Sequence, residues 1–542
     1  MAHLICPIPA VPGAGKAPAI PDIDLTPKDT SMATAATDRE AGQHEYKPPR
    51  SILIVGSGVF GLSTALSLAR HPEIPPSTPI AVVDRSPDAG VFPARDAASI
   101  DSSRIIRADY ADAAYSKLAG EAQAHWRRGR NDPDALGGDG RYSESGLLLA
   151  ADAGNGATVR ADGHPTGLGY AKRSWVNALA LAHAEGRPLS SVRLVPLPYA
   201  IAKATGTGGE WADWGYLNTT AGWADAERSM RWLYDRVVRT GRVTFVNGTV
   251  EALETEMQAG ETQTETQRVT GARLSDGRNL SADLVIVAAG AWTPSLVDLS
   301  GQAVATGQCL AYLRLTDVEQ AKLVKMPVCL NLTDGCFAIP PRDGVLKIAR
   351  HAYGYLNPQP VSHEPLGPSL GPRDEDDGLA AKRVSQPRTH LTDPSLSIPA
   401  EAAADLRRAL RRMIPWPELA ERPFFKTRLC WYTDTATGDW IIDYHPSYKN
   451  LFIATGGSGH AFKFLPILGD KIVNCLLGRC PEEFRDKWKW KGRVGIRPSS
   501  DDSQRVRTRG QEGTLADDLA VELIIATEDG SRGGKPGLIL SD

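Results

Sequence analysis

The sequence predicts a protein of mixed α/β and α+β class, in which a domain with a parallel sheet is interleaved with a second, mixed-sheet domain. Two observations predict this arrangement. A strand, a glycine-rich turn, a helix and a second strand follow one another within residues 51–84, and two further apolar strands lie far downstream. Because each of these strands runs into a turn of small residues, we expect them to share one sheet.

Short apolar runs mark the strands of this sheet. Ser51–Val55 and Pro79–Asp84 are apolar and β-branched, as buried parallel strands are, and Leu62–Arg70 between them has a helical pattern. Together they form a βαβ unit. Two more runs of the same kind, Asp283–Ala289 and Leu451–Thr455, each end at a glycine. The chain between these strands is therefore expected to build the second domain.

The turn after the first strand has the spacing G-x-G-x-x-G. It consists of Gly56, Ser57, Gly58, Val59, Phe60 and Gly61. In such a turn the first glycine lets the chain reverse, the second lets the backbone approach a pyrophosphate, and the third lets the helix pack closely on the strand. The helix N-terminus adds free N–H groups and a positive dipole. The sequence therefore predicts a Rossmann-like dinucleotide-binding domain.

An acidic residue closes the second strand. Asp84 can accept hydrogen bonds from both ribose hydroxyls, although it lies 28 residues after Gly56, later than is usual. An acid at this position disfavours a 2′-phosphate and hence NADP. The motif alone leaves FAD and NAD open.

Composition and charge disfavour several other classes of protein. The chain of 542 residues has 61 basic and 64 acidic residues, a net charge of −3 and 42% hydrophobic residues. This balance does not indicate nucleic-acid binding, and no apolar run is long enough for a membrane span. The seven cysteines show no framework spacing. We expect a monomeric cytoplasmic protein with no signal peptide, no peroxisomal Ser-Lys-Leu end and no metal site.

Three stretches lack a periodic apolar pattern and fall outside the predicted domains. Residues 1–48 are rich in Pro, Ala, Thr and Asp, and residues 495–542 are polar and rich in Gly, Arg and Asp. We therefore expect a disordered leader and a mostly disordered tail. Residues 364–398 carry many Pro and Asp residues and are expected to form a surface insertion.

Several further motifs occur as a set between about residues 50 and 490. They are Ser99–Tyr110, Gly215–Asp225, Ala288–Trp292, Leu346–His351, Cys430–Pro446 and Gly456–Phe464. In content and order they resemble the FAD-dependent amine and amino-acid oxidases of the monomeric sarcosine oxidase, fungal fructosyl amino acid oxidase and saccharopine oxidase type. The chain departs from that pattern at Thr435–Asp439, where relatives often have Thr-Pro-Asp, and at Ala461, where they have glycine.

The resemblance implies a D-amino-acid-oxidase-like fold with discontinuous domains. The Rossmann-like FAD-binding domain would comprise residues 49–110, 215–300 and 428–480, and the substrate domain residues 111–214 and 301–427.

The resemblance also implies that the cofactor is FAD, attached through Cys430 as a thioether to the flavin 8α-methyl group. Taken alone, a free cysteine is more often a small buried hydrophobe. Lys426 and Arg428 are nearby cations that could stabilise its thiolate if they face it. Besides Cys430 and the glycine-rich turn, the expected cofactor-binding residues are Asp84, Arg85, Ser99, Ser103, Arg104, Val250, Gly290, Gly457, Ser458, Gly459, His460 and Lys463.

Four residues receive roles in the reaction from the same resemblance. Arg107 and Lys463 match the positions that hold the substrate carboxylate, a pairing that suits two converging cations. Lys347 matches a lysine beside flavin N5 that assists oxygen, and His351 matches a histidine near the substrate amine. Taken singly, such residues are more often surface charges or structural groups.

The resemblance thus predicts an oxidase of a CH–NH bond. Its substrate would be a small secondary amine, such as an N-methyl amino acid, saccharopine or pipecolate, or a fructosyl amino acid. O2 would be the electron acceptor, and an imine and H2O2 the products. Two alternatives remain: a flavin dehydrogenase or tailoring oxidoreductase of secondary metabolism that uses another acceptor, and a non-catalytic flavoprotein.

Overall fold

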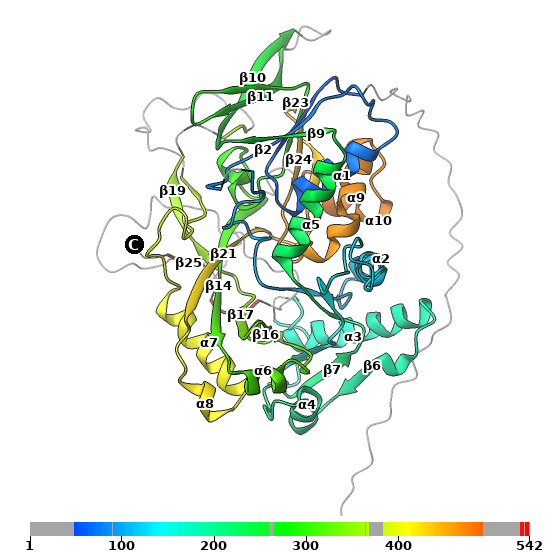
Figure 1. Cartoon of the computed structure of the whole chain (residues 1–542), viewed down its shortest axis with the longest axis vertical. Coiled ribbons are helices and arrows are strands. Elements are labelled where there is room, and N and C mark those ends of the chain that lie inside the picture. The colour runs from blue at the N-terminus through cyan, green and yellow to red at the C-terminus, as the bar shows by residue number, and fades with distance from the viewer. Residues whose placement is uncertain are drawn as a thin grey trace, which may run out of the picture. The chain divides into compact units, whose positions relative to one another are not determined.

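The computed structural model describes most of the chain after the expected leader. The described residues are 48–88, 90–161, 163–259, 265–361, 363, 365–367, 383–491, 532–535 and 537–540. The predicted leader, apart from residue 48, lies outside them. Within them the chain forms two main sheets with helices packed on both (Figure 1). None of the described helices is both long and apolar enough to span a membrane.

The predicted parallel sheet is present, and the distant strands meet in it. Among the described residues its order is β22 (Ile441–Tyr444), β24 (Leu451–Thr455), β13 (Leu284–Val287), β1 (Ile52–Val55), β2 (Ile80–Asp84) and β9 (Val243–Asn247). Only the edge strand β22 runs antiparallel to its neighbour. The four strands expected from the sequence are thus confirmed as neighbours.

Both faces of this sheet are buried, which explains why its strands read as unbroken apolar runs. Ile52 and Ile54 point to one core cluster, whereas Leu53 and Val55 point to another. The first face is covered by α1 (Val59–Arg70), α5 (Ala226–Arg239), α9 (Leu465–Leu476), α2 (Ala113–Arg127) and α10 (Glu482–Trp488). The second face is covered by a smaller sheet of β10 (Val250–Ala259), β11 (Glu265–Leu274), β12 (Asn279–Ser281) and β23 (Tyr448–Lys449).

The second main sheet builds the other domain and is mixed, as expected. Its described strands run in the order β25 (Leu538–Ile539), β18 (Tyr355–Leu356), β14 (Ala303–Arg314), β17 (Val345–Arg350), β16 (Cys336–Arg342), β15 (Val328–Asn331), β5 (Leu147–Ala151), β7 (Trp214–Asn218) and β6 (Val192–Val195), with β21 (Lys426–Thr435) also paired to β14. Two small sheets accompany it: β3 (Arg104–Ile106), β8 (Gly222–Ala224) and β4 (Tyr142–Ser143), and β19 (Pro358–Pro360) with β20 (Arg383–Ser385).

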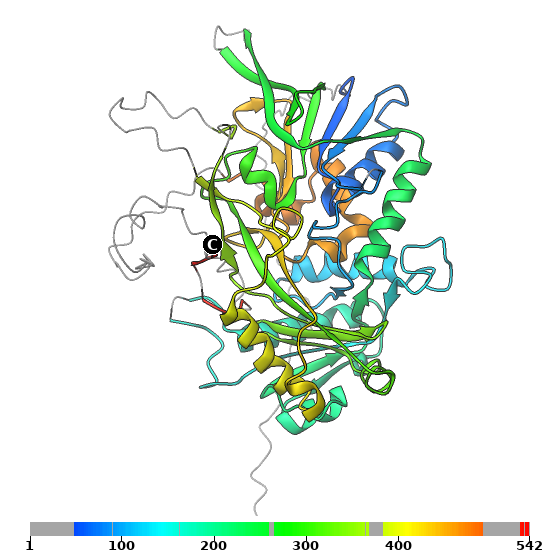
Figure 2. The same ribbon diagram turned by 60° about the vertical axis from the view of Figure 1, so that its left-hand side comes forward.

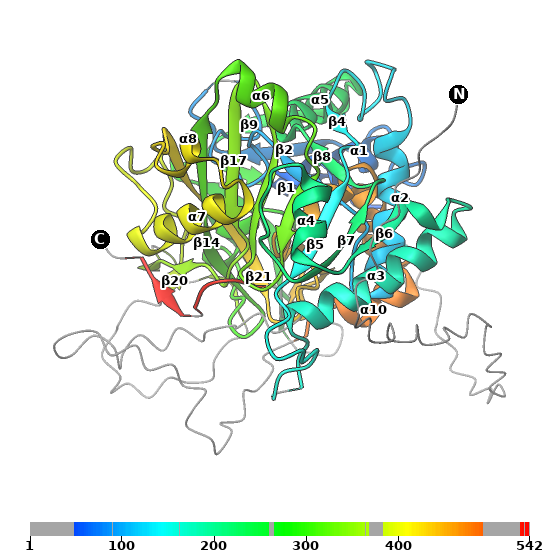
Figure 3. The ribbon, with the colours of Figure 1, turned by 90° about the horizontal axis from the view of Figure 1, so that it is seen from below.

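The two faces of this mixed sheet have different roles. Leu346 and Ile348 belong to the core under α7 (Ala400–Met413), which lies against β14, β16 and β17 (Figures 2 and 3). Because side chains alternate along a strand, Lys347 and Ala349 point to the opposite face. The remaining described helices of this domain are α3 (Gly167–Ala184), α4 (Pro198–Thr205), α6 (Asp317–Leu323) and α8 (Pro417–Ala420), with a 3-10 turn at Leu189–Ser191. Two further 3-10 turns, Gly290–Ser295 and Ala461–Phe464, follow β13 and β24 of the parallel sheet.

Three expected domain boundaries differ from the structure. Residues 215–218, expected in the FAD-binding domain, form β7 and pair with β5 and β6 of the mixed sheet. Residues 428–435 form β21 and pair with β14 of the same sheet. In the other direction, α2 begins at residue 113 but packs against α9 of the parallel-sheet domain. Apolar runs reveal that a segment is buried but not which core buries it.

The described ends of the expected surface insertion and of the expected, mostly disordered tail are also integrated into the fold. In the 364–398 stretch, Thr389 is 1% exposed and donates a hydrogen bond to Asp96 at 2.6 Å. In the 495–542 stretch, β25 pairs with β18, and the 5% exposed Arg532 forms an ion pair with Asp434 at 2.9 Å. The polar composition of these segments did not predict that they belong to the fold. They are held by single polar side chains and short strands, which leave no apolar pattern in the sequence.

Candidate active site

The glycine-rich turn has the geometry that its spacing predicts. Gly56 has φ +103°, a conformation that suits only glycine. A Cβ on Gly61 would lie 1.9 Å from the carbonyl oxygen of Gly56, so only glycine lets α1 pack this closely on the turn. A Cβ on Gly58 would meet nothing within 4 Å, and Gly58 lines a cavity. The backbone of Gly58 is therefore open to a ligand.

Two alanine substitutions should separate packing from ligand approach. We expect Gly61→Ala to destabilise the protein by about 1–3 kcal/mol, as overpacking does. Gly58→Ala should leave the unfolding midpoint of the flavin-free protein unchanged but weaken flavin binding. Urea unfolding and flavin titration measure the two effects. Equal effects of both variants on unfolding would contradict this assignment.

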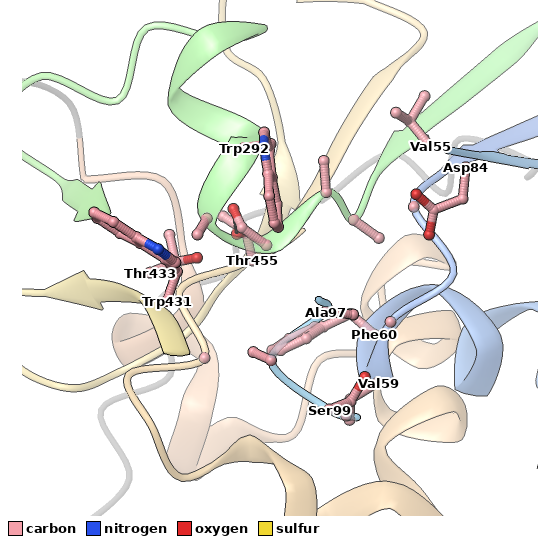
Figure 4. A pocket seen from close by; sticks show the side chains of 18 of the residues that line it. Val55, Val59, Phe60, Asp84, Ala97, Ser99, Trp292, Trp431, Thr433 and Thr455 are labelled. Carbon is pink, nitrogen blue, oxygen red and sulfur yellow. Dashed lines mark hydrogen bonds between the residues drawn. The ribbon is translucent and has the colours of Figure 1, made fainter. Parts of the chain in front are cut away.

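Asp84 lies at the carboxyl end of β2, on the wall of this cavity (Figure 4). Its Oδ2 accepts hydrogen bonds from the amide of Ser57 at 2.8 Å and from the Ser57 hydroxyl at 2.5 Å. Burial raises the pKa of Asp84 above its usual value, against these hydrogen bonds. Ser57 thus fixes the carboxylate in the place expected for a ribose contact.

The cavity is completed by segments from distant parts of the chain. Figure 4 shows Asp84 on one side, Trp431 on the other, and Ser99 beside Val59. The buried hydroxyl of Ser99 has no hydrogen-bond partner among the described residues, so it can serve a ligand. The expected cofactor residues that line this cavity are Gly56, Gly58, Val59, Phe60, Asp84, Arg85, Ser99, Arg104, Val250, Gly290, Gly457, Ser458 and Gly459.

A second cavity adjoins the first. The two share four wall residues: Arg104, Tyr432, Gly459 and Phe462. The expected site residues Ser103, Arg107, Lys347, His351, Cys430, His460 and Lys463 line the second cavity, not the first. Much of the remaining wall is apolar and is formed by Ile105, Leu310, Leu330, Leu332, Phe337, Ile339 and Ala349.

Cys430 is buried on β21 and lines the second cavity. Its side chain is in a cluster with Leu310 and Ala349, on the face of the mixed sheet away from α7. The cation that reaches its sulfur is Arg104, whose Nη2 donates to Sγ at 3.5 Å.

The two cations next to Cys430 in sequence point elsewhere. Arg428 donates to the carbonyl oxygen of Ala97 at 2.9 Å, and Lys426 lies over the ring of Tyr312. The expectation that they stabilise the thiolate is therefore corrected to Arg104, which comes from a segment 326 residues away in the chain.

Arg107 and Lys463 form an excess of positive charge in the second cavity. Lys463 donates to the Tyr110 hydroxyl at 2.7 Å and to the carbonyl oxygen of His460 at 2.8 Å. The buried Nη1 of Arg107 has no partner among the described residues. The neighbouring carboxylate of Asp109 is bound by Asn218 and Tyr216. Two cations face one engaged carboxylate, which favours an added anion.

The two histidines of the expected site differ in their surroundings. The Nδ1 of His460 is 3.0 Å from the Tyr110 hydroxyl and its Nε2 is 2.8 Å from the carbonyl oxygen of Gly438, so both ring nitrogens are engaged within the protein. Its ring stacks on Trp440. A contact of the His460 side chain with a cofactor is therefore not supported. His351 lines the second cavity, and burial, then the charge of Arg532, holds its pKa well below the usual value.

Several site residues were missed in the sequence. Tyr110 links Lys463 to His460, and Tyr432 lies between the two cavities. Asp101 binds Lys347 at 2.6 Å. Tyr110 and Asp101 fall within the Ser99–Tyr110 motif, but only the long-range contact identifies their partners.

A cavity of the dinucleotide-binding type thus adjoins a buried cavity that is lined by cationic side chains. The family model for FAD-dependent oxidoreductases matches residues 51–475. The chain is 34% identical over 483 residues to the amino acid oxidase imqH of Aspergillus flavus, covering 82% of this chain and 98% of the relative. It is 30% identical to L-saccharopine oxidase of Schizosaccharomyces pombe, covering 82% and 93%.

Among solved structures, the fructosyl peptide oxidase from E. terrenum superposes with a TM-score of 0.67 at 26% identity, covering 82% of this chain and 92% of that one. The chain belongs to the family of FAD-dependent oxidoreductases. The cavity residues fit FAD, because the open backbone at Gly58, the unpartnered Ser99 hydroxyl and the Asp84 carboxylate offer the contacts that a dinucleotide needs.

Proposed function

We propose that this protein oxidises the C–N bond of an N-substituted amino acid with an apolar side chain, using FAD attached to Cys430 and O2 as electron acceptor. The observation that carries the proposal is the pair Arg107 and Lys463 in a buried cavity that shares a wall with the dinucleotide cavity. A carboxylate bound there would neutralise the excess charge. When bound, FAD would accept the two electrons of the C–H bond beside the nitrogen, which leaves a C=N bond, and would pass them to O2.

The protein side chains would orient the substrate and stabilise charge. Arg107 and Lys463 hold the carboxylate, which turns the amine toward the shared wall of the two cavities. His351, kept neutral by burial, can accept a hydrogen bond from the amine N–H. Lys347 is mostly protonated at neutral pH, because burial lowers its pKa only to about 8. Its charge would stabilise negative charge that develops on oxygen.

The wall of the second cavity favours apolar substrates within this class. Arg350 also lines the cavity, but its guanidinium is paired with Glu401 at 2.9 Å. Lys347 and Arg104 are both bound by Asp101. Among the described residues that line this cavity, Arg107 and Lys463 are then the cations available to the substrate. Together they bind one carboxylate. The additional carboxylates of saccharopine or the hydroxyls of a fructosyl group would face apolar side chains, at a cost in desolvation.

Attachment of the cofactor at Cys430 would form one bond between Sγ and the 8α carbon. The thiol proton and one 8α proton leave, and the two remaining electrons pass to O2. Arg104 is placed to stabilise negative charge on the sulfur before the bond forms.

An H2O2-coupled assay with a panel of amines tests the proposed function. We expect H2O2 in proportion to the amine consumed, with N-methyl leucine or N-methyl phenylalanine preferred over N-methyl aspartate, saccharopine and fructosyl lysine. Reduction of an added dye without H2O2 would instead indicate a dehydrogenase. A preference for the polar substrates would contradict the assignment of the apolar wall.

Binding of the substrate carboxylate should weaken as the pH rises. It should do so at a lower pH than a lysine with an ordinary pKa would produce. Burial, then the charge of Arg107, holds the pKa of Lys463 well below its usual value of 10.5. Since lysine is charged only below its pKa, the carboxylate contact is present at lower pH and lost as pH rises through that lowered pKa. We expect an alkaline limb in kcat/KM below pH 10.5. Lys463→Met should remove this limb, and a limb that persists in the variant would refute the assignment.

A further inference from the structure

A buried carboxylate, that of Asp101, binds residues that line the two cavities and connects four elements of the fold. Asp101 is 6% exposed. Its Oδ1 accepts a hydrogen bond from Tyr312 of β14 at 2.6 Å, and its Oδ2 accepts one from Lys347 of β17 at 2.6 Å. Arg104 of β3 also binds Oδ2. The charge of Arg428 of β21 acts on the same carboxylate. We call Asp101, Arg104, Tyr312, Lys347 and Arg428 the Asp101 cluster.

The cluster fixes the position of Lys347. The side chain is 3% exposed, and Nζ donates to Asp101 and to the carbonyl oxygen of Ser103 at 2.7 Å. Both acceptors belong to the loop before β3. Without Asp101, Nζ would keep only one of its two described acceptors.

The same carboxylate holds the cation that faces the flavin-attachment cysteine. Arg104 binds Asp101 through Nη1, while its Nη2 lies 3.5 Å from Sγ of Cys430. Arg104 lines both cavities. Asp101 therefore orients two cations toward two different reacting positions: the sulfur and the second cavity.

Charge in the cluster is unbalanced in favour of cations. Burial alone would raise the pKa of Asp101, but the charges of Lys347, Arg104 and Arg428 hold it well below its usual value. For Lys347, burial and the charge of Arg104 lower the pKa, whereas Asp101 raises it. Removal of the carboxylate leaves Lys347 beside Arg104 and without the main charge that opposes burial. Its protonation at neutral pH thus depends on Asp101.

We infer that Asp101 is a positioning residue for both cofactor attachment at Cys430 and electron transfer to O2. It acts on attachment through Arg104 and on O2 through Lys347. The first effect requires only that FAD is attached at Cys430, and the second rests on the proposed role of Lys347. In the oxygen step, O2 takes up two electrons and two protons and leaves as H2O2.

The test uses the full-length protein with two readouts. The first is the rate at which flavin becomes resistant to release by acid when flavin-free protein is mixed with FAD. The second is the pH dependence of oxidation by O2 after anaerobic reduction. In Asp101→Asn we expect attachment to slow about tenfold or more, the worth of a charge-assisted hydrogen bond. The alkaline limb of the O2 reaction should move to lower pH.

Two further variants separate charge from structure. Arg104→Gln should slow attachment but move the limb to higher pH, because Arg104 lowers the pKa of Lys347. Tyr312→Phe removes a hydrogen bond from the same carboxylate but keeps its charge, so the limb should stay at its wild-type pH. A general loss of structure would not move the alkaline limb of the O2 reaction to lower pH in Asp101→Asn and to higher pH in Arg104→Gln.

The possible outcomes distinguish this inference from the proposed function. The inference would be overturned if Asp101→Asn attached flavin at the wild-type rate and the alkaline limb of its O2 reaction stayed at the wild-type pH. If Asp101→Asn does not fold, Arg104→Gln provides the test. An alkaline limb that does not move to higher pH in this variant would also overturn the inference. If Lys347→Met reacts with O2 like wild type, the proposed role of Lys347 fails, while the attachment rate still tests the action through Arg104.

Discussion

Replacement of Cys430 by serine is expected to release all flavin from the acid-denatured protein, whereas the wild type should keep its yellow colour on the polypeptide. Cys430 is 2% exposed and lines the second cavity. Its sulfur faces Arg104 at 3.5 Å. A serine hydroxyl is far less acidic than a thiol and should not form the bond. The serine differs by one atom, so the fold and a non-covalent flavin should persist.

Cys309 provides a matched control for this experiment. It lies on β14, next to β21, but its side chain belongs to the core under α7. Cys309→Ser should therefore keep the flavin attached. Retention of colour in Cys430→Ser, or its loss in Cys309→Ser, would show that the attachment site is elsewhere. Absorbance and mass spectrometry of the denatured chain give the answer.

The second large effect is expected at the carboxylate clamp. Arg107→Met and Lys463→Met should each reduce kcat/KM for a carboxylate substrate by about 10- to 100-fold, since hydrogen bonds to charged groups contribute about 1.5–3 kcal/mol. The loss should appear mainly in KM if the clamp holds substrate and transition state equally. The double variant should lose less than the product of the two effects, because both cations bind one group.

A substrate in which an amide replaces the carboxylate distinguishes loss of the carboxylate contact from a general loss of structure. With the carboxylate replaced by a carboxamide, wild type and both variants should have similar kcat/KM. Lys471→Met, which removes a lysine paired with Glu121 on the surface, should behave as wild type with both substrates. If Arg107→Met impaired the amide and the acid equally, the arginine would serve the fold and not the carboxylate.

Local sequence patterns predicted the cofactor half of the fold. The strand, turn and helix from Ser51 to Arg70 follow from apolar runs and glycine spacing, and both are local. The shared sheet of strands from three distant regions followed from their common character. The helix begins three residues earlier than expected, at Val59, because the end of the turn already adopts helical conformation.

Partners at long range could not be read from the chain. Lys347 and Asp101 are 246 residues apart, and neither residue has a local pattern that points to the other. Arg104 reaches Cys430 across 326 residues. Both ring nitrogens of His460 are engaged by Tyr110 and Gly438, which only packing decides. The attachment at Cys430, the monomeric state and the cytoplasmic location stay predictions.

Anaerobic reduction of the purified protein tests the central claim most directly. Mixing with N-methyl phenylalanine in the absence of oxygen should bleach the visible flavin absorbance, and admission of O2 should restore it with one H2O2 for each amine oxidised. A protein that carries flavin but is bleached by no amine with a carboxylate would contradict the account, and a purified protein unable to bind any flavin would remove its basis.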